Sequence, residues 1–147
     1  YDDLVKKLIV YSKEIEGAAM KRIFIVDLTT VKRTFLSNKP KLKPEDEIII
    51  FWSGSHRKLP FSILEEASET MATVSDFRSG SKKEDIQFVI SSYTGLKVGE
   101  LGSKAEYYMI TRDHQYSALL DFVKSNYSDI RIYRAATIYD AIGKEVG

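Results

Sequence analysis

Cysteine is absent from this sequence of 147 residues. Its absence excludes disulfide bonds, thiol catalysis and cysteine-based zinc sites, so a reducing compartment, the cytoplasm, is the simpler expectation. The chain also lacks an apolar run of about 18 residues, the length that a membrane-spanning helix requires. It contains neither a GxSxG elbow nor a Walker-type phosphate-binding loop. Nothing in it therefore supports serine-hydrolase chemistry or a phosphate site of that type.

The chain also has no large excess of charge of either sign, because it contains 22 basic and 21 acidic residues and its net charge is +1. Net charge alone therefore gives no sign of a nucleic-acid partner. Hydrophobic residues make up 44% of the chain, which is enough for one core and too many for a disordered segment. The length fits a single domain. Since the chain starts at Tyr1 rather than at Met, we expect it to be a segment of a longer protein.

Short apolar runs alternate with amphipathic stretches along most of the chain. The runs read RIFIVDL, EIIIFW, ATVSDF, EYYMIT and IRIY, and the amphipathic stretches occupy residues 30–38, 59–71, 82–100, 116–126 and 137–146. Strands that are apolar along their whole length are typical of a parallel sheet covered on both faces. We therefore predict a three-layer, doubly wound α/β domain with a five-stranded, mainly parallel sheet.

The first residues have the spacing of a separate amphipathic helix. Asp2 or Asp3 can cap its start and Gly17 can end it. Apolar side chains recur at helical spacing in this segment, at Leu4, Val5, Leu8, Ile9 and Ile15. We expect residues 1–20 to form an extra N-terminal helix and residues 21–147 to form the α/β domain.

Two aspartates stand where predicted strands end. Asp27 closes the first strand and Asp113 follows the fourth. If these strands are neighbours at the point where strand order reverses, both carboxylates face one cleft. Oxygen ligands of this kind suit Mg²⁺ or Mn²⁺, and such a metal can activate water for phosphodiester hydrolysis. The alternative is that each aspartate caps the helix that follows it.

Three segments resemble motifs of the PIN-like superfamily, which includes the NYN nucleases. They read IVDLTTV, IQFVISSYTG and TRDHQYS, where such proteins carry patterns like VDxENV, LDFxLSxxxG and KDxGFD. The similarity runs from Lys21 to Ile142 and includes the order of the predicted elements. It implies the ancestry of a metal-dependent endoribonuclease, with Asp27 and Asp113 as ligands of Mg²⁺ or Mn²⁺.

The sequence departs from this resemblance at several acidic positions. The Glu and Asn that follow the first acid fall on Thr29 and Thr30, the helical Asp falls on Gln87, and the last acid falls on Ser117. A site with only two carboxylates is expected to hold Mg²⁺ weakly. Because charge around a metal also tunes its bound water, we expect hydrolysis to suffer more than binding.

Glu84 is the one acid that can compensate for Gln87, because it lies one turn earlier on nearly the same face of the predicted helix. Its alternative role is that of a first-turn acid favoured by the helix dipole. If catalysis survives, the resemblance implies that Asp27 and Asp113 hold the metal, Glu84 assists, and water attacks the phosphodiester.

Basic residues cluster in segments that the predicted fold places beside the two aspartates, whereas NKPKLK falls on the opposite edge. A ring of cations around a small acidic centre suits an RNA backbone, with an affinity that falls as salt rises. The alternative is an ordinary solvated surface. The candidate RNA-binding residues are Lys32, Arg33, Arg57, Lys58, Arg78, Lys82, Lys83 and Arg112.

Two aromatic residues and two histidines near predicted strand ends have open roles. Trp52 and Phe77 can stack on bases or pack in the core. His56 and His114 can bind phosphate, act as general acids, or be plain surface residues.

The function that fits these residues best is RNA binding at the carboxyl edge of the sheet, with hydrolysis weakened or lost, as in a pseudoenzyme. The alternative is a catalytically inactive protein-interaction or regulatory module, in which the N-terminal helix docks on a protein partner or forms a homodimer. A nucleotide-sensing domain ranks last, because no glycine-rich loop follows the first strand.

Overall fold

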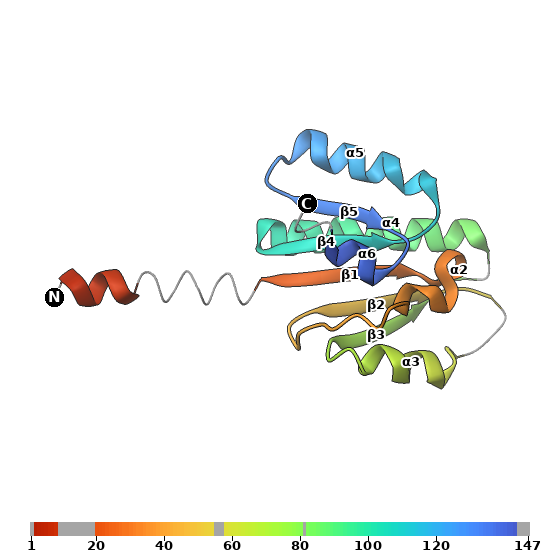
Figure 1. Ribbon diagram of the computed structural model, residues 1–147. Coiled ribbons are helices and arrows are strands. Elements are labelled where there is room, and N and C mark those ends of the chain that lie inside the picture. The colour runs from red at the N-terminus through yellow and green to blue at the C-terminus, as the bar shows by residue number, and fades with distance from the viewer. Residues whose placement is uncertain (1, 9–19, 55–57, 81, 144–147) are drawn as a thin grey trace.

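The computed structural model describes residues 2–8, 20–54, 58–80 and 82–143. A five-stranded sheet with every strand parallel has the order β3-β2-β1-β4-β5, and helices cover both faces (Figure 1). This confirms the predicted three-layer, doubly wound architecture.

The strands are β1 (Lys21–Asp27), β2 (Glu47–Trp52), β3 (Thr73–Arg78), β4 (Ala105–Ile110) and β5 (Arg131–Ala135). The α-helices are α2 (Leu28–Val31), α3 (Phe61–Ser68), α4 (Lys83–Leu101), α5 (Ser117–Asn126) and α6 (Ile138–Gly143). Three 3₁₀ turns are η1 (Lys32–Leu36), η2 (Gly102–Lys104) and η3 (His114–Tyr116).

Two hydrophobic clusters lie on the two faces of the sheet, because successive side chains of a strand point to opposite faces. In the central strand β1, Phe24 and Val26 join the cluster under α2, η1, α3 and α6. Ile23 and Ile25 join the cluster under α4 and α5. All four side chains are almost fully buried. This is why β1 reads as a continuous apolar run rather than as an alternating one.

The predicted helix at residues 30–38 is instead two short pieces, α2 and η1. Lys32, the first residue of η1, has a φ of 50°, a conformation that interrupts a regular helix. The Thr30 hydroxyl also bonds back to Asp27, and such local side-chain hydrogen bonds compete with a regular helix. The interruption still places Phe35 in the core, where it is fully buried.

Other predicted elements agree closely with the structure, with two differences in detail. The helical spacing of residues 82–100 puts Ile86, Val89, Ile90 and Tyr93 on one face and predicts that this face is buried. Ile86 and Ile90 are buried in α4 as this spacing predicts, but Val89 is 38% exposed. Residues 2–8 are helical, and the rest of the predicted N-terminal helix lies outside the described residues, as do residues 144–146 of the last one. None of the helices that the structure describes combines the length and apolarity needed to span a bilayer.

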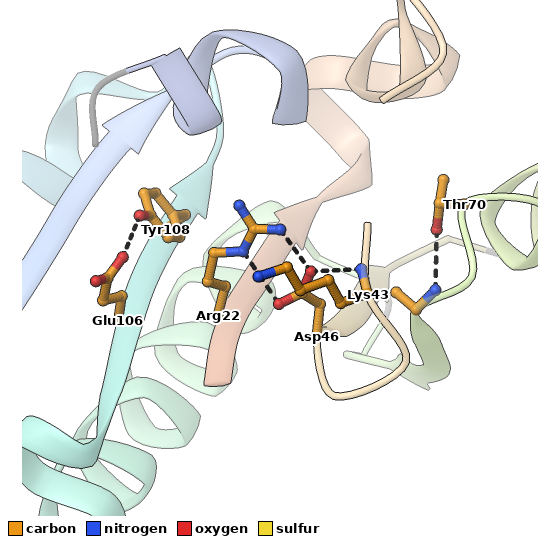
Figure 2. A network of polar contacts seen from close by, with 7 residues as sticks. Arg22, Lys43, Asp46, Thr70, Glu106 and Tyr108 are labelled. Atoms are coloured by element: carbon orange, nitrogen blue, oxygen red, sulfur yellow. Dashed lines mark hydrogen bonds and ion pairs between the residues drawn. The ribbon is translucent and has the colours of Figure 1, made fainter. Parts of the chain in front are cut away.

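The amino edge of the sheet is closed by polar contacts (Figure 2). Arg22 Nε and Nη2 donate to the two carboxylate oxygens of Asp46 at 3.0 and 2.7 Å, and the backbone N–H of Lys43 donates to Asp46 Oδ2 at 2.8 Å. On the neighbouring strand, Tyr108 Oη donates to Glu106 Oε2 at 2.7 Å. The NKPKLK segment, which ends at Lys43, therefore lies at the opposite end of the sheet from Asp27, as predicted.

A carboxylate pair at the switch point

Strand order reverses between β1 and β4, which pair directly with Val26 opposite Ile110. Asp27 ends β1, and Thr111 is the first residue beyond β4. Asp27 continues the register of Ile23 and Ile25, so its side chain belongs to the face covered by α4 and α5. The prediction that the first and fourth strands are neighbours is therefore confirmed, and the crevice at this point is where such sheets place their ligands.

Asp27 is almost fully buried, with 2% of its surface exposed, and hydroxyl groups surround its carboxylate. Thr29 Oγ1 donates to Oδ1 at 2.5 Å, and Thr111 Oγ1 donates to Oδ2 at 3.0 Å. Thr30 Oγ1 makes a longer contact to Oδ2 at 3.3 Å. The carboxylate makes no capping bond to the backbone of α2, so the capping alternative for Asp27 is wrong. Its burial is instead compensated by three uncharged donors.

The same threonines connect Asp27 to the segment that carries Asp113. Thr111 Oγ1 accepts a hydrogen bond from the backbone N–H of Asp113 at 3.0 Å, and Thr30 Oγ1 accepts one from the backbone N–H of Arg112 at 3.0 Å. The two hydroxyl oxygens lie 3.2 Å apart. This network holds the loop after β4 against the loop after β1.

Asp113 is half-buried and accepts from two glutamines. Gln87 Nε2, from α4, donates to Oδ2 at 2.6 Å, and the backbone N–H of Gln115 donates to Oδ1 at 2.9 Å. The second bond makes Asp113 the N-cap of η3, the turn that leads into α5. The predicted cap of the helix at residues 116–126 is therefore found one turn earlier, because Asp113 caps η3 while α5 itself has Tyr116 as its N-cap and no side-chain cap bond. Gln87 Nε2 also donates to Gln115 Oε1 at 2.8 Å.

Tyr116 is a buried tyrosine close to both carboxylates. Its side chain is 3% exposed, and its hydroxyl has no hydrogen-bond partner within the described part of the chain. Burial raises the pKa of this phenol, and the nearby negative charges of Asp27 and Asp113 raise the pKa further. Sequence reasoning missed Tyr116, because a tyrosine before an amphipathic stretch gives no sign of the charges around it.

The donors around these aspartates fit a divalent cation poorly. All four carboxylate oxygens of Asp27 and Asp113 already accept hydrogen bonds from protein groups. Each oxygen has a second lone pair, so a cation would share these oxygens with the donors, and only two carboxylates would offset its charge. Over the described residues, no group of three or more His, Cys, Asp or Glu is arranged to hold a metal.

Two other positions that the resemblance singles out also lie near this end of the sheet: Glu84, the possible assisting acid, and Ser117, which stands where an acid is implied. Glu84 is exposed in the first turn of α4, one turn before Gln87, and Asp85 beside it accepts from the backbone N–H of Lys82. Ser117 begins α5 and is half-buried. Glu84 as an assisting acid therefore stays a prediction.

The predicted basic residues belong to connections at the carboxyl edge, where all five strands end. Exposed cations there are Lys32, Lys58, Lys82 and Arg112. Arg33 Nη2 donates to Ser62 Oγ at 2.5 Å, and Arg33 also pairs with Glu66. Arg78 donates twice to a backbone carbonyl of the loop after β2. Arg57 and the side chain of Lys83 lie outside the described residues.

The structure buries one of the two aromatic candidates, exposes the other, and describes only one of the two histidines. Trp52 is buried in the core and donates from Nε1 to an oxygen of Asp76, so core packing is confirmed as the role of its ring. Phe77 packs against Phe51 and Tyr93 but stays 48% exposed, so its role is still open. His56 lies outside the described residues.

His114 is exposed, and its Nδ1 atom lies 3.2 Å from Nη2 of Arg134. Arg134 also donates to the carbonyl oxygen of Thr111 at 3.4 Å, which adds a cation at the carboxyl edge. Sequence reasoning missed Arg134, because it belongs to none of the basic clusters in the connecting segments. Its place one residue before the end of a strand was the available signal.

The comparison with protein families matches residues 21–131 to the PIN domain. The chain belongs to the PIN domain family. PIN domains have a nuclease-like fold, are typically dependent on divalent metals, and commonly bind RNA. No curated protein and no solved structure matches the chain. The PIN assignment agrees with the resemblance noted in the sequence, and it covers the strands and loops that carry Asp27 and Asp113.

Proposed function

We propose that this PIN domain binds RNA at the carboxyl edge of its sheet and that its hydrolytic activity is weakened or lost. One observation carries the proposal: protein donors engage all four oxygens of Asp27 and Asp113. Gln87 occupies the helical position where the resemblance implies an acid, and it donates to Asp113 at 2.6 Å. An amide at this position carries no negative charge, and it donates a hydrogen bond to the carboxylate of Asp113.

The cations of the same edge support an RNA partner. Lys32, Lys58, Lys82 and Arg112 are exposed and come from four different connections around the carboxylate pair. Phosphate contacts of this kind release counterions, so binding is expected to weaken steeply as salt rises. If any hydrolysis persists, we assign it to Asp27 and Asp113 with Mg²⁺ or Mn²⁺, assisted by Glu84.

The first experiment measures binding and cleavage in the same samples. A labelled single-stranded RNA is incubated with the protein in Mn²⁺ and, in parallel, in Mg²⁺. The control is the Asp27→Asn, Asp113→Asn double variant. We expect binding without cleavage in both proteins. Cleavage by the wild type that disappears in the double variant would contradict the loss of activity, because it would require a working metal at the two aspartates.

A charge-reversal pair tests where the RNA binds. The Lys58→Glu, Lys82→Glu variant is expected to bind RNA more weakly and to show a salt-dependence slope that is smaller by about 1 for each lost phosphate contact. The matched control is Lys39→Glu, Lys41→Glu, which makes the same change in net charge at the opposite edge of the sheet. Equal losses in both variants would show that the carboxyl edge is not the binding surface.

The protein-interaction alternative has one specific observation in its favour. Phe88 and Leu96 on α4 are 73% and 74% exposed, and Leu4 and Leu8 in the N-terminal helix are 60% and 58% exposed. Apolar side chains gathered on one surface often mark protein contacts. Sedimentation velocity over a range of protein concentrations tests this role, and concentration-dependent association without RNA binding would favour it over the RNA proposal.

A further inference from the structure

A hollow of about 270 Å³ opens beside the carboxylate pair, between α4 and the η3–α5 segment. Its volume lies just below the range typical of pockets for drug-sized ligands, so it suits a smaller group. Polar and aromatic side chains both line it. They include Gln87, Phe88, Ser91, Gln115 and Tyr116. Gln87 and Gln115 therefore belong both to this hollow and to the hydrogen bonds around Asp113.

Asp113 fixes the direction of both glutamine amides. A carboxylate only accepts hydrogen bonds, so Gln87 must present its Nε2 group to Asp113. The same Nε2 group donates to Gln115 Oε1, which fixes the second amide as well. Two polar atoms have no hydrogen-bond partner within the residues that the structure describes: Gln87 Oε1, an acceptor, and Gln115 Nε2, a donor.

Phe88 supplies a flat apolar surface to the same hollow. Its side chain is 73% exposed, although it follows Gln87 directly on α4. It also borders a second, apolar hollow that contains the open ring of Phe77. Exposed aromatic rings at the edge of a basic surface are the platforms on which single-stranded nucleic acids stack their bases.

We propose that this hollow binds one unpaired nucleobase of an RNA strand, with adenine preferred. The base stacks on Phe88, its amino group donates to Gln87 Oε1, and a ring nitrogen accepts from Gln115 Nε2. Adenine offers an amino donor next to a ring acceptor on both its Watson–Crick and Hoogsteen edges. A purine also covers more of the phenylalanine ring than a pyrimidine does. The inference rests on the proposed RNA binding and names the part of the RNA that the site recognises.

The experiment measures fluorescence anisotropy with labelled oligoadenylate, oligouridylate and oligocytidylate of equal length. The wild type is expected to bind oligoadenylate most tightly. Phe88→Ala is expected to weaken that binding by about tenfold. Gln115→Met keeps the volume and loses the donor, so it is expected to reduce the preference for oligoadenylate while binding of oligouridylate changes little. Phe122→Ala is the matched control, because Phe122 is 58% exposed on α5 and lies outside the hollow.

The outcomes separate this inference from the proposed function. Equal binding of all three RNAs, unchanged in Phe88→Ala, overturns the base site and leaves RNA binding in place. No binding of any RNA by the wild type overturns both. If Phe88→Ala changes self-association in sedimentation velocity but not RNA affinity, the ring belongs to a protein contact and the base site is also overturned. Loss of the oligoadenylate preference in Gln115→Met alone supports the hydrogen-bonding part of the inference.

Discussion

Threonine and glutamine side chains decide the character of the carboxylate pair. A hydroxyl or amide donor satisfies a buried carboxylate without adding charge, whereas further carboxylates would repel it and call for a cation. Thr29 and Thr30 meet Asp27 in this way, and Gln87 meets Asp113. The site is therefore satisfied by the protein itself, which is the physical reason to expect weak metal binding.

Restoring an acid at Gln87 should reverse this balance. In Gln87→Asp the donor to Asp113 is lost and a carboxylate takes its place, so like charges meet at Asp113. We expect the variant to melt at a lower temperature than the wild type in a chelator and to recover in Mn²⁺, because a ligand that binds only the folded state stabilises it. The wild type should respond much less. Thermal unfolding with and without Mn²⁺ measures both effects.

Ser92→Asp is the control for that substitution, because it adds one negative charge to an exposed position of the same helix. It should show no recovery in Mn²⁺. If Gln87→Asp melts at the same temperature in the chelator and in Mn²⁺, the amide is not what keeps a cation from the aspartates.

Among the structural elements, the two edges of the sheet are built differently. At the amino edge, Asp46 is 1% exposed, pairs with Arg22 through both oxygens, and accepts from the backbone of Lys43. It thereby anchors the loop between η1 and β2 to β1. The carboxyl edge instead carries loops joined by hydroxyl and amide contacts, and that edge presents its cations to solvent.

Removing the anchor at the amino edge should destabilise the fold. Asp46→Ala takes away both bonds to Arg22 and the acceptor for the Lys43 N–H, and we expect a loss of about 3 kcal/mol in the free energy of unfolding. Asp46→Asn should lose less, because it keeps the shape and one acceptor oxygen. Urea unfolding followed by circular dichroism measures these differences.

The neighbouring residue provides the control. Glu47 makes a partly exposed ion pair with Lys21 at 3.5 Å, and its replacement by Ala should cost less than about 1 kcal/mol. A loss in Asp46→Ala no larger than that in Glu47→Ala would show that the network in Figure 2 does not hold the amino edge.

The stability of the whole molecule should fall at alkaline pH. Burial, and then the charges of Glu47 and Glu100, raise the pKa of Tyr93 from 10.0 to about 12. Between these values the unfolded chain loses this proton and the folded chain keeps it, so stability present below pH 10 is lost as the pH rises towards 12. The pKa values of Tyr107 and Tyr116 are raised as well, which adds to the same trend.

Urea unfolding below pH 10 and between pH 10 and pH 12 tests this trend at Tyr93. The Tyr93→Phe variant should lose less stability than the wild type over that interval, because it has no proton to release at this position. An equal loss in both proteins would show that Tyr93 does not contribute to the alkaline instability.

The architecture could be predicted from the sequence because a strand that is buried on both faces of the sheet reads as a continuous apolar run. EIIIFW coincides with β2 and RIFIVDL with β1 to within one residue at each end. The pattern failed where local hydrogen bonds compete with periodicity. Thr30 binds back to Asp27 and Lys32 adopts a positive φ, so a predicted helix became two short pieces. The exposure of Val89 was also missed, because the spacing of α4 gives a broad apolar stripe and does not say where packing ends.

The sequence by itself determined the parallel α/β domain and the place of Asp27 and Asp113 at strand ends, and its resemblance to PIN-like nucleases predicts that Gln87 and Ser117 stand where such proteins carry acids. Only the tertiary structure decided which donors meet those aspartates. Thr111 and Gln87 reach the site from segments far from Asp27 in the chain, and hydrogen bonding depends on distances that no linear pattern contains. The hollow beside Phe88 was decided in the same way, because it exists only where α4 and α5 come together.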